Sequence, residues 1–77
     1  MRRYFFDTRD GKNFFLDDEG QEMPTLEMVR VEATRSLAEL ARDVLPGSLK
    51  RKITVEVRDG KKPVLKLALT FEATSLI

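Results

Sequence analysis

The sequence predicts an α+β fold in which two β-hairpins flank one long helix. Thr25–Leu45 carries the only long helical pattern, and a pair of short strand-like runs lies on each side of it. Each pair is joined by an Asp-Gly dipeptide, the strongest short-range hairpin signal. Hairpins this short are not stable alone in water. We therefore expect the order ββαββ, with one four-stranded antiparallel sheet and the helix packed on one face.

The first hairpin is predicted from aromatic residues around its turn. Arg3–Thr8 is predicted as one strand and Asn13–Leu16 as its return. We predict a type I′ turn over Arg9–Lys12, with Asp10 and Gly11 at the two positive-φ positions. Each strand contains two adjacent phenylalanines: Phe5 and Phe6 in the first, and Phe14 and Phe15 in the second. One of each pair must point away from the helix, and the sequence leaves open which, because a one-residue shift in register exchanges them.

The central helix is predicted from apolar spacing and from its cap signals. Asp17–Pro24 is expected to be a loop, followed by Thr25 as the N-cap and by Glu27 at the positive end of the helix dipole. Pro46 and Gly47 end the helical pattern. Spacings of three and four residues place one apolar stripe on the helix: Leu26, Val29, Ala33, Leu37, Leu40 and Val44. We expect this stripe to pack on the sheet.

The second hairpin alternates more regularly than the first. Lys50–Arg58 and Val64–Ala73 are predicted as strands joined by a turn over Asp59–Pro63. Apolar residues alternate along one face of both strands: Ile53, Val55, Val57, Leu65, Leu67, Leu69 and Phe71. The opposite sheet face would be exposed and would hold one member of each phenylalanine pair. An exposed aromatic face on so small a domain is a candidate dimer surface.

Length and composition indicate one small domain over residues 1–77. Such a chain buries only about 60–65% of its unfolded surface, and small domains compensate with disulfides, metals or oligomerisation. The sequence has no cysteine and no histidine, so we expect a homodimer. No apolar run approaches the ~20 residues of a membrane-spanning helix. The N-terminus does not resemble a targeting segment, so we expect a cytoplasmic protein with no membrane partner.

The sequence lacks the residue patterns of an enzyme. The acidic run Asp17–Glu22 does not have the spacing of a calcium-binding EF-hand. The serines, at Ser36, Ser48 and Ser75, lie in no nucleophile motif, and the glycines are scattered singly. We therefore predict no catalytic residue, no cofactor-binding residue and no metal site.

Positive charge gathers in the second part of the chain. Residues 46–77 hold seven basic and three acidic residues, a net charge of +4, and residues 1–45 hold seven and ten, a net charge of −3. One interpretation is a nucleic-acid surface on the second hairpin, formed by Lys50, Arg51, Lys52, Arg58, Lys61 and Lys62. A second is that basic residues on edge strands prevent sheets from aggregating. A third is that the two oppositely charged segments attract each other.

Arg30 is the one charged helix residue inside the edge of the apolar stripe, about 40° from its centre. A partly buried arginine needs a carboxylate partner. We predict a structural salt bridge, with Asp7, Asp17 and Asp18 as candidate partners. The alternative is a role for Arg30 in binding a ligand.

Two segments of the first half resemble a known family. The opening Arg3–Gly11 and the run from Asp17 to Leu26 resemble short alphaproteobacterial proteins, abundant in rhizobia, whose domain has no assigned function. The resemblance implies a small bacterial stand-alone domain and brings no binding site with it. More weakly, Thr25-Leu26-Glu27 and Glu32-Ala33 are similar to the helix entry of the HicB-like antitoxin domain, from which the chain departs by having a hairpin on each side of the helix.

These observations lead to two hypotheses for function. The first is a small non-enzymatic protein that acts as a homodimeric protein-interaction module with an unidentified protein partner. The alternative is a nucleic-acid-associated or antitoxin-like regulator that uses the basic C-terminal hairpin.

Overall fold

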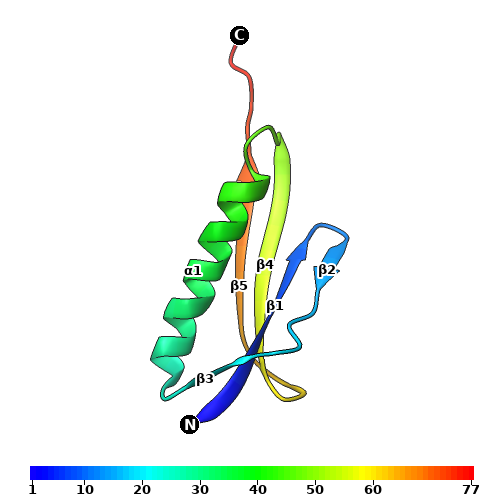
Figure 1. Cartoon of the computed structure of the whole chain (residues 1–77). Helices are drawn as coiled ribbons and strands as arrows, with labels where there is room; N and C mark the ends of the chain where they lie inside the picture. The colour runs from blue at the N-terminus through cyan, green and yellow to red at the C-terminus, as the bar shows by residue number, and fades with distance from the viewer.

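The computed structural model describes residues 1–77 as an α+β fold, in which one helix lies across one face of an antiparallel sheet (Figure 1). Its elements are β1 (Arg2–Asp10), β2 (Asn13–Phe15), β3 (Gln21–Met23), α1 (Leu26–Val44), β4 (Lys50–Asp59) and β5 (Lys62–Glu72). The predicted class is confirmed, but the sheet has five strands instead of four. The additional strand, β3, lies in the segment predicted as a loop, because three residues between Gly20 and Pro24 are too few to show an alternating pattern.

The sheet has the strand order β2-β1-β4-β5, and the β1–β4 pair joins the two hairpins. In this pair Phe6 lies opposite Val57 and Asp10 lies opposite Ile53. The short strands both pair with β1, β3 with its first residues and β2 with its last residues. The chain between β2 and β3 contacts the middle of β1, as described below.

The two hairpin turns use glycine differently from the prediction. Asp10 pairs with Asn13, and Asp59 pairs with Lys62, so each turn has a glycine and then a lysine as its central residues. Gly11 and Gly60 have φ values of 60° and 63°, and no other residue type has positive φ. This is the pattern of a type II′ turn, with glycine first, and it corrects the predicted type I′ turn at Asp-Gly.

Helix α1 begins and ends close to the predicted residues. The Thr25 hydroxyl accepts the backbone N–H of Met28 at 3.2 Å, which confirms the N-cap. The middle of the predicted stripe is buried, with Val29 and Ala33 fully covered. Leu26 is 62% exposed despite its place on the stripe. It lies in the first turn of α1, whereas the helix packs mainly on β4.

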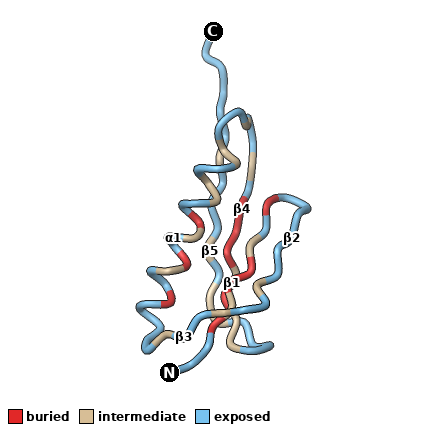
Figure 2. Tube along the Cα trace, in the orientation of Figure 1, coloured by how far each residue is buried: buried red, intermediate tan, exposed pale blue.

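The core is a narrow layer between α1 and the central strands (Figure 2). It consists of Tyr4, Phe6, Val29, Ala33, Leu37, Ile53, Val55 and Val57. Phe6 is therefore the member of its pair that faces the helix, and Phe5 lies on the outer face of the sheet. Phe15, opposite Thr8, shares the helix-facing side but is exposed, and Phe14 is on the outer face opposite Arg9.

Candidate functional site

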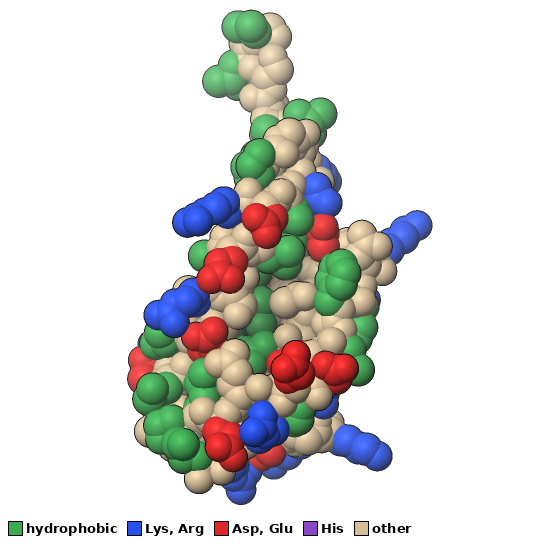
Figure 3. Space-filling view, viewed as in Figure 1, with side chains coloured by type: hydrophobic (Ala, Val, Ile, Leu, Met, Phe, Trp, Pro, Cys, Tyr) green, Lys and Arg blue, Asp and Glu red, His purple; other side chains and the backbone are tan.

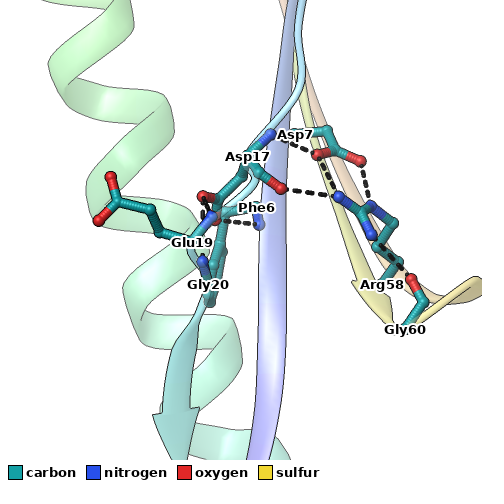
Figure 4. Close-up of polar contacts among 7 residues, drawn as sticks. All are labelled: Phe6, Asp7, Asp17, Glu19, Gly20, Arg58 and Gly60. Carbon is teal, nitrogen blue, oxygen red and sulfur yellow. Dashed lines mark hydrogen bonds and ion pairs between the residues drawn. The ribbon is translucent and has the colours of Figure 1, made fainter.

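A polar network closes the middle of the outer edge of β1 (Figure 4). Asp7 is only 5% exposed although it lies on the outer face. The Nε of Arg58 donates to its Oδ2 at 2.8 Å, while the other guanidinium nitrogens donate to the carbonyls of Asp17 and Gly60 at 2.7 and 2.8 Å. The hydrogen bond to Asp7 raises the pKa of Arg58 above its ordinary value. The guanidinium also lies over the ring of Phe5, 4.5 Å from its centroid.

Asp17 takes the place of a neighbouring strand at this point. Its carboxylate accepts the backbone N–H of Phe6 at 3.0 Å, and its own N–H donates to the Asp7 carboxylate at 2.9 Å. The same carboxylate accepts the N–H groups of Glu19 and Gly20, each at 3.1 Å. Burial acts to raise the pKa of Asp17, but these N–H donors together with Arg58 outweigh it and hold the pKa below its usual value.

A second ionic cluster ties the end of α1 to the sheet. The Nε and Nη2 of Arg51 donate to the two carboxylate oxygens of Asp10, both at 2.8 Å. Its Nη1 donates to the carbonyl of Val44 at 2.9 Å and to the hydroxyl of Ser48 at 2.7 Å. The hydrogen bond from Arg51 lowers the pKa of Asp10. The Val44 carbonyl, at the end of the helix, also accepts the hydroxyl of Ser48 at 2.7 Å, so Arg51 and Ser48 together satisfy it.

The salt bridge predicted for Arg30 is not formed in the structure. Arg30 is exposed, and its partner is Glu27, three residues earlier on the helix. Neither Asp7 nor Asp17 contacts it, because both belong to the Arg58 network on the other side of the sheet, and Asp18 is exposed. The sequence contained the signal for the observed pair, since residues three apart are neighbours on a helix.

The predicted basic surface is divided between the two ends of β4. Lys50 and Lys52 lie near its start, and Lys61 and Lys62 belong to the turn and strand that follow its far end. The two arginines of the set, Arg51 and Arg58, are held by Asp10 and Asp7. On the face shown in Figure 3, basic and acidic side chains are intermixed. Attraction between the oppositely charged first and second parts of the chain thus accounts for two of the six predicted residues, Arg51 and Arg58.

A hollow on the outer sheet face is the first feature that the sequence did not indicate. It has a volume of about 170 Å³, and its lining residues are Arg9, Gly11, Lys52, Thr54, Glu56 and Lys66. Thr54 is 5% exposed, and its hydroxyl has no hydrogen-bond partner. Arg9 lies over the ring of Phe14, 4.7 Å from its centroid. The hollow depends on the order of β1, β4 and β5 in the sheet, so no local motif could have revealed it.

The unpaired edge of β5 is the second such feature. β5 is the last strand of the sheet, and no segment of the chain pairs with its far side. Next to this edge an apolar groove of about 440 Å³ separates β5 from the end of α1. Its lining residues are Ala38, Ala41, Arg42, Leu45, Pro46 and Phe71. Leu69 on β5 is 36% exposed.

No group of three or more acidic residues is arranged so that it could hold a metal ion. Helix α1 does not combine the length and the apolar character that crossing a membrane would require.

Comparison with known proteins identifies a family without an assigned activity. The model of a family described as Domain of unknown function (DUF6894) matches residues 3–70. Neither the curated proteins nor the solved structures contain a match.

Proposed function

Because the chain belongs to the DUF6894 family, whose description names no activity, we propose a function from its surface: a non-catalytic protein-interaction module that works as a homodimer. The observation that supports this proposal is the open edge of β5. The resemblance to rhizobial proteins supports a bacterial setting, and we propose a cytoplasmic location for the module. An exposed strand edge is a template for pairing with another chain unless it is blocked.

The direction of the backbone groups on β5 follows from its pairing with β4. Ala73 donates its backbone N–H to the carbonyl of Leu49 at 2.8 Å. Along an antiparallel strand, successive residues point their backbone N–H and C=O groups alternately toward one neighbouring strand and away from it. From Leu65 onward, the odd-numbered residues of β5 therefore form hydrogen bonds with β4. The residues whose backbone groups point away from β4, toward the open edge, are Lys66, Ala68, Thr70 and Glu72. Before Leu65, the irregularity between Val57 and Arg58 shifts the alternation, so the regular open edge starts after it.

This open edge is complementary to itself. A twofold axis through Leu69 pairs Ala68 with the partner's Thr70 and places Lys66 opposite the partner's Glu72. The oppositely charged pair occurs twice because the interface is symmetric. On the helix-facing side, the same register places the partner's Leu67 beside Phe71, which lines the apolar groove. Backbone pairing, charge and apolar contact therefore favour the same arrangement.

The outer face of the sheet supports a dimer less well than the β5 edge does. Its two aromatic residues, Phe5 and Phe14, lie beneath the guanidinium groups of Arg58 and Arg9. The remainder of the face is lined by Lys52, Glu56 and other polar residues. The interface expected from the sequence on this face is accordingly replaced by one at the edge.

Sedimentation equilibrium of the full chain tests the dimer. We expect dissociation at about 10–100 µM, typical of a small interface. Ala68→Pro removes an outward N–H that bonds to nothing within the chain, so it should give a folded monomer. Ala68→Val keeps the N–H and is the matched control, which should remain dimeric.

A charge-reversal series tests the register. Lys66→Glu or Glu72→Lys alone should weaken the dimer by about fivefold to tenfold, and the two changes together should restore it. A wild-type chain that stays monomeric at millimolar concentration would exclude the homodimer. Salt-sensitive binding of RNA or DNA by such a monomer would instead support the alternative hypothesis, a nucleic-acid-associated regulator similar to the HicB-like antitoxin domain.

A further inference from the structure

We propose that the hollow on the outer sheet face binds one hydrogen phosphate ion. Its lining combines three basic side chains, of Arg9, Lys52 and Lys66, with a hydroxyl and one carboxylate. None of the three basic residues takes part in an ion pair within the chain, in contrast to Arg51 and Arg58. They come from β1, β4 and β5, so the sheet itself brings them together.

Thr54 supplies the observation that indicates a ligand. It lies opposite Arg9 on β1 and opposite Ala68 on β5, in a row of cross-strand neighbours. Its side chain is buried beneath longer ones, yet its hydroxyl has neither a donor nor an acceptor within reach. Buried hydroxyl groups normally have a hydrogen-bond partner. An oxyanion in the hollow would accept the hydroxyl proton while the cations neutralise its charge.

The size of the hollow limits the ligand. A volume of about 170 Å³ accommodates one tetrahedral oxyanion with some water. Of the other lysines of the basic hairpin, Lys50 lies beside Glu72, and Lys61 and Lys62 follow the far end of β4. The site therefore suits a single small anion rather than the backbone of a nucleic acid.

Glu56 selects among small anions. Its carboxylate lines the same hollow and can only accept hydrogen bonds when it is ionised. Hydrogen phosphate has one O–H group that can donate to this carboxylate. Sulfate has the same shape and charge but no proton to donate, so its oxygens would face the carboxylate without compensation. The site should consequently prefer phosphate to sulfate.

Titration followed by ¹⁵N chemical shifts of the full chain, at constant ionic strength, tests the site with inorganic phosphate and with sulfate as probes. We expect saturable shifts centred on Thr54, and about tenfold weaker binding of sulfate. Lys52→Gln should weaken phosphate binding at least about fivefold, and Thr54→Val should weaken it without unfolding the sheet, because valine has the same branched shape. Lys61→Gln, outside the hollow, is the control and should leave binding unchanged.

Selectivity gives a second, independent readout. Glu56→Gln should bring the affinities for phosphate and sulfate to within about twofold of each other, because the amide can donate to either anion. The absence of saturation, equal binding of both anions by the wild type, or equal effects of Lys52→Gln and Lys61→Gln would each overturn the proposal. The Ala68→Pro monomer, in which Lys66 no longer faces the partner's Glu72, should still bind phosphate, so the site and the dimer can fail separately.

Discussion

The two edges of the sheet are completed in different ways. Along the edge at β1, the chain turns back and covers itself, with β2 and β3 at the ends and Asp17 in the middle. Along the edge at β5, no part of the chain provides a partner. The comparison shows that an edge can be closed by one carboxylate and two very short strands. It also shows that the longest strand of the molecule is left available to another chain.

Removal of the central carboxylate of the closed edge should have the largest effect. Asp7→Ala removes the carboxylate that neutralises Arg58, and it leaves the Nε of Arg58 and the N–H of Asp17 without an acceptor in a mostly buried position. Breaking such a pair costs about 3 kcal/mol in the free energy of unfolding. Urea denaturation measures this change, and Asp18→Ala, on an exposed neighbouring residue, should stay within about 0.5 kcal/mol of the wild type.

The loop that closes this edge depends on Gly20 as well. Its φ is 73°, and a Cβ at this position would lie 2.8 Å from a ring carbon of Phe5 and 2.9 Å from the Cγ of Arg3. Gly20→Ala therefore combines backbone strain with a steric clash, and should lower the free energy of unfolding by about 2 kcal/mol. Gly11→Ala has a similar φ but open space around the added atom, so it should cost about 1 kcal/mol. Equal costs for the two variants would exclude the clash.

Asp17 gives the closed edge a dependence on pH. The folded state holds its pKa below the ordinary value, so the folded chain binds this proton at lower pH than the unfolded chain. The stabilisation is complete above pH about 5 and disappears as the pH falls through the unfolded pKa near 3.9 and then the lower folded one. Asp17→Asn should cost about 1–2 kcal/mol at pH 7.

Thermal unfolding between pH about 7 and 2 measures this dependence. The Asp17→Asn variant should lose less stability on acidification than the wild type, and the remaining loss should include that of Asp10, whose pKa is lowered by the hydrogen bond from Arg51. Parallel curves for the wild type and the variant would contradict the role of Asp17.

The smallest effect is expected beside the open edge. Lys50 on β4 lies 4.0 Å from Glu72 on β5, and both side chains are largely exposed. Exposed ion pairs contribute little, so Lys50→Gln should change the free energy of unfolding by less than about 0.5 kcal/mol. A cost comparable with that of Asp7→Ala would remove the contrast between the two edges.

The sequence was sufficient for the elements that local patterns determine. The apolar spacing and the Thr25 cap predicted α1 to within one residue, and alternation predicted β4 closely. The strand β3 was missed because Gln21–Met23 is too short and too polar to show a period, and its partner on β1 makes it a strand. The turn type was missed because the hairpin register shifts the central pair by one residue, from Asp-Gly to Gly-Lys.

The candidate sites were harder to predict because they depend on distant residues. Arg58 and Asp7 are separated by 51 positions, so their pairing requires the strand order of the whole sheet. The assignment of Asp7 to Arg30 was wrong for the same reason, since the helix and the outer sheet face lie on opposite sides of the core. Thr54 would have been expected simply as an outward-facing strand residue, and only the side chains around it make it a buried hydroxyl.

The pairing of β1 with β4 has a consequence for the order in which the molecule forms. β1 is synthesised first, but its central partner follows more than forty residues later. Contacts so distant in sequence form late and slowly, because a long loop must be ordered before they can be made. During synthesis the aromatic side chains of β1 therefore remain without their core until β4 has been made. Over that interval the nascent chain is most exposed to aggregation and to capture by chaperones.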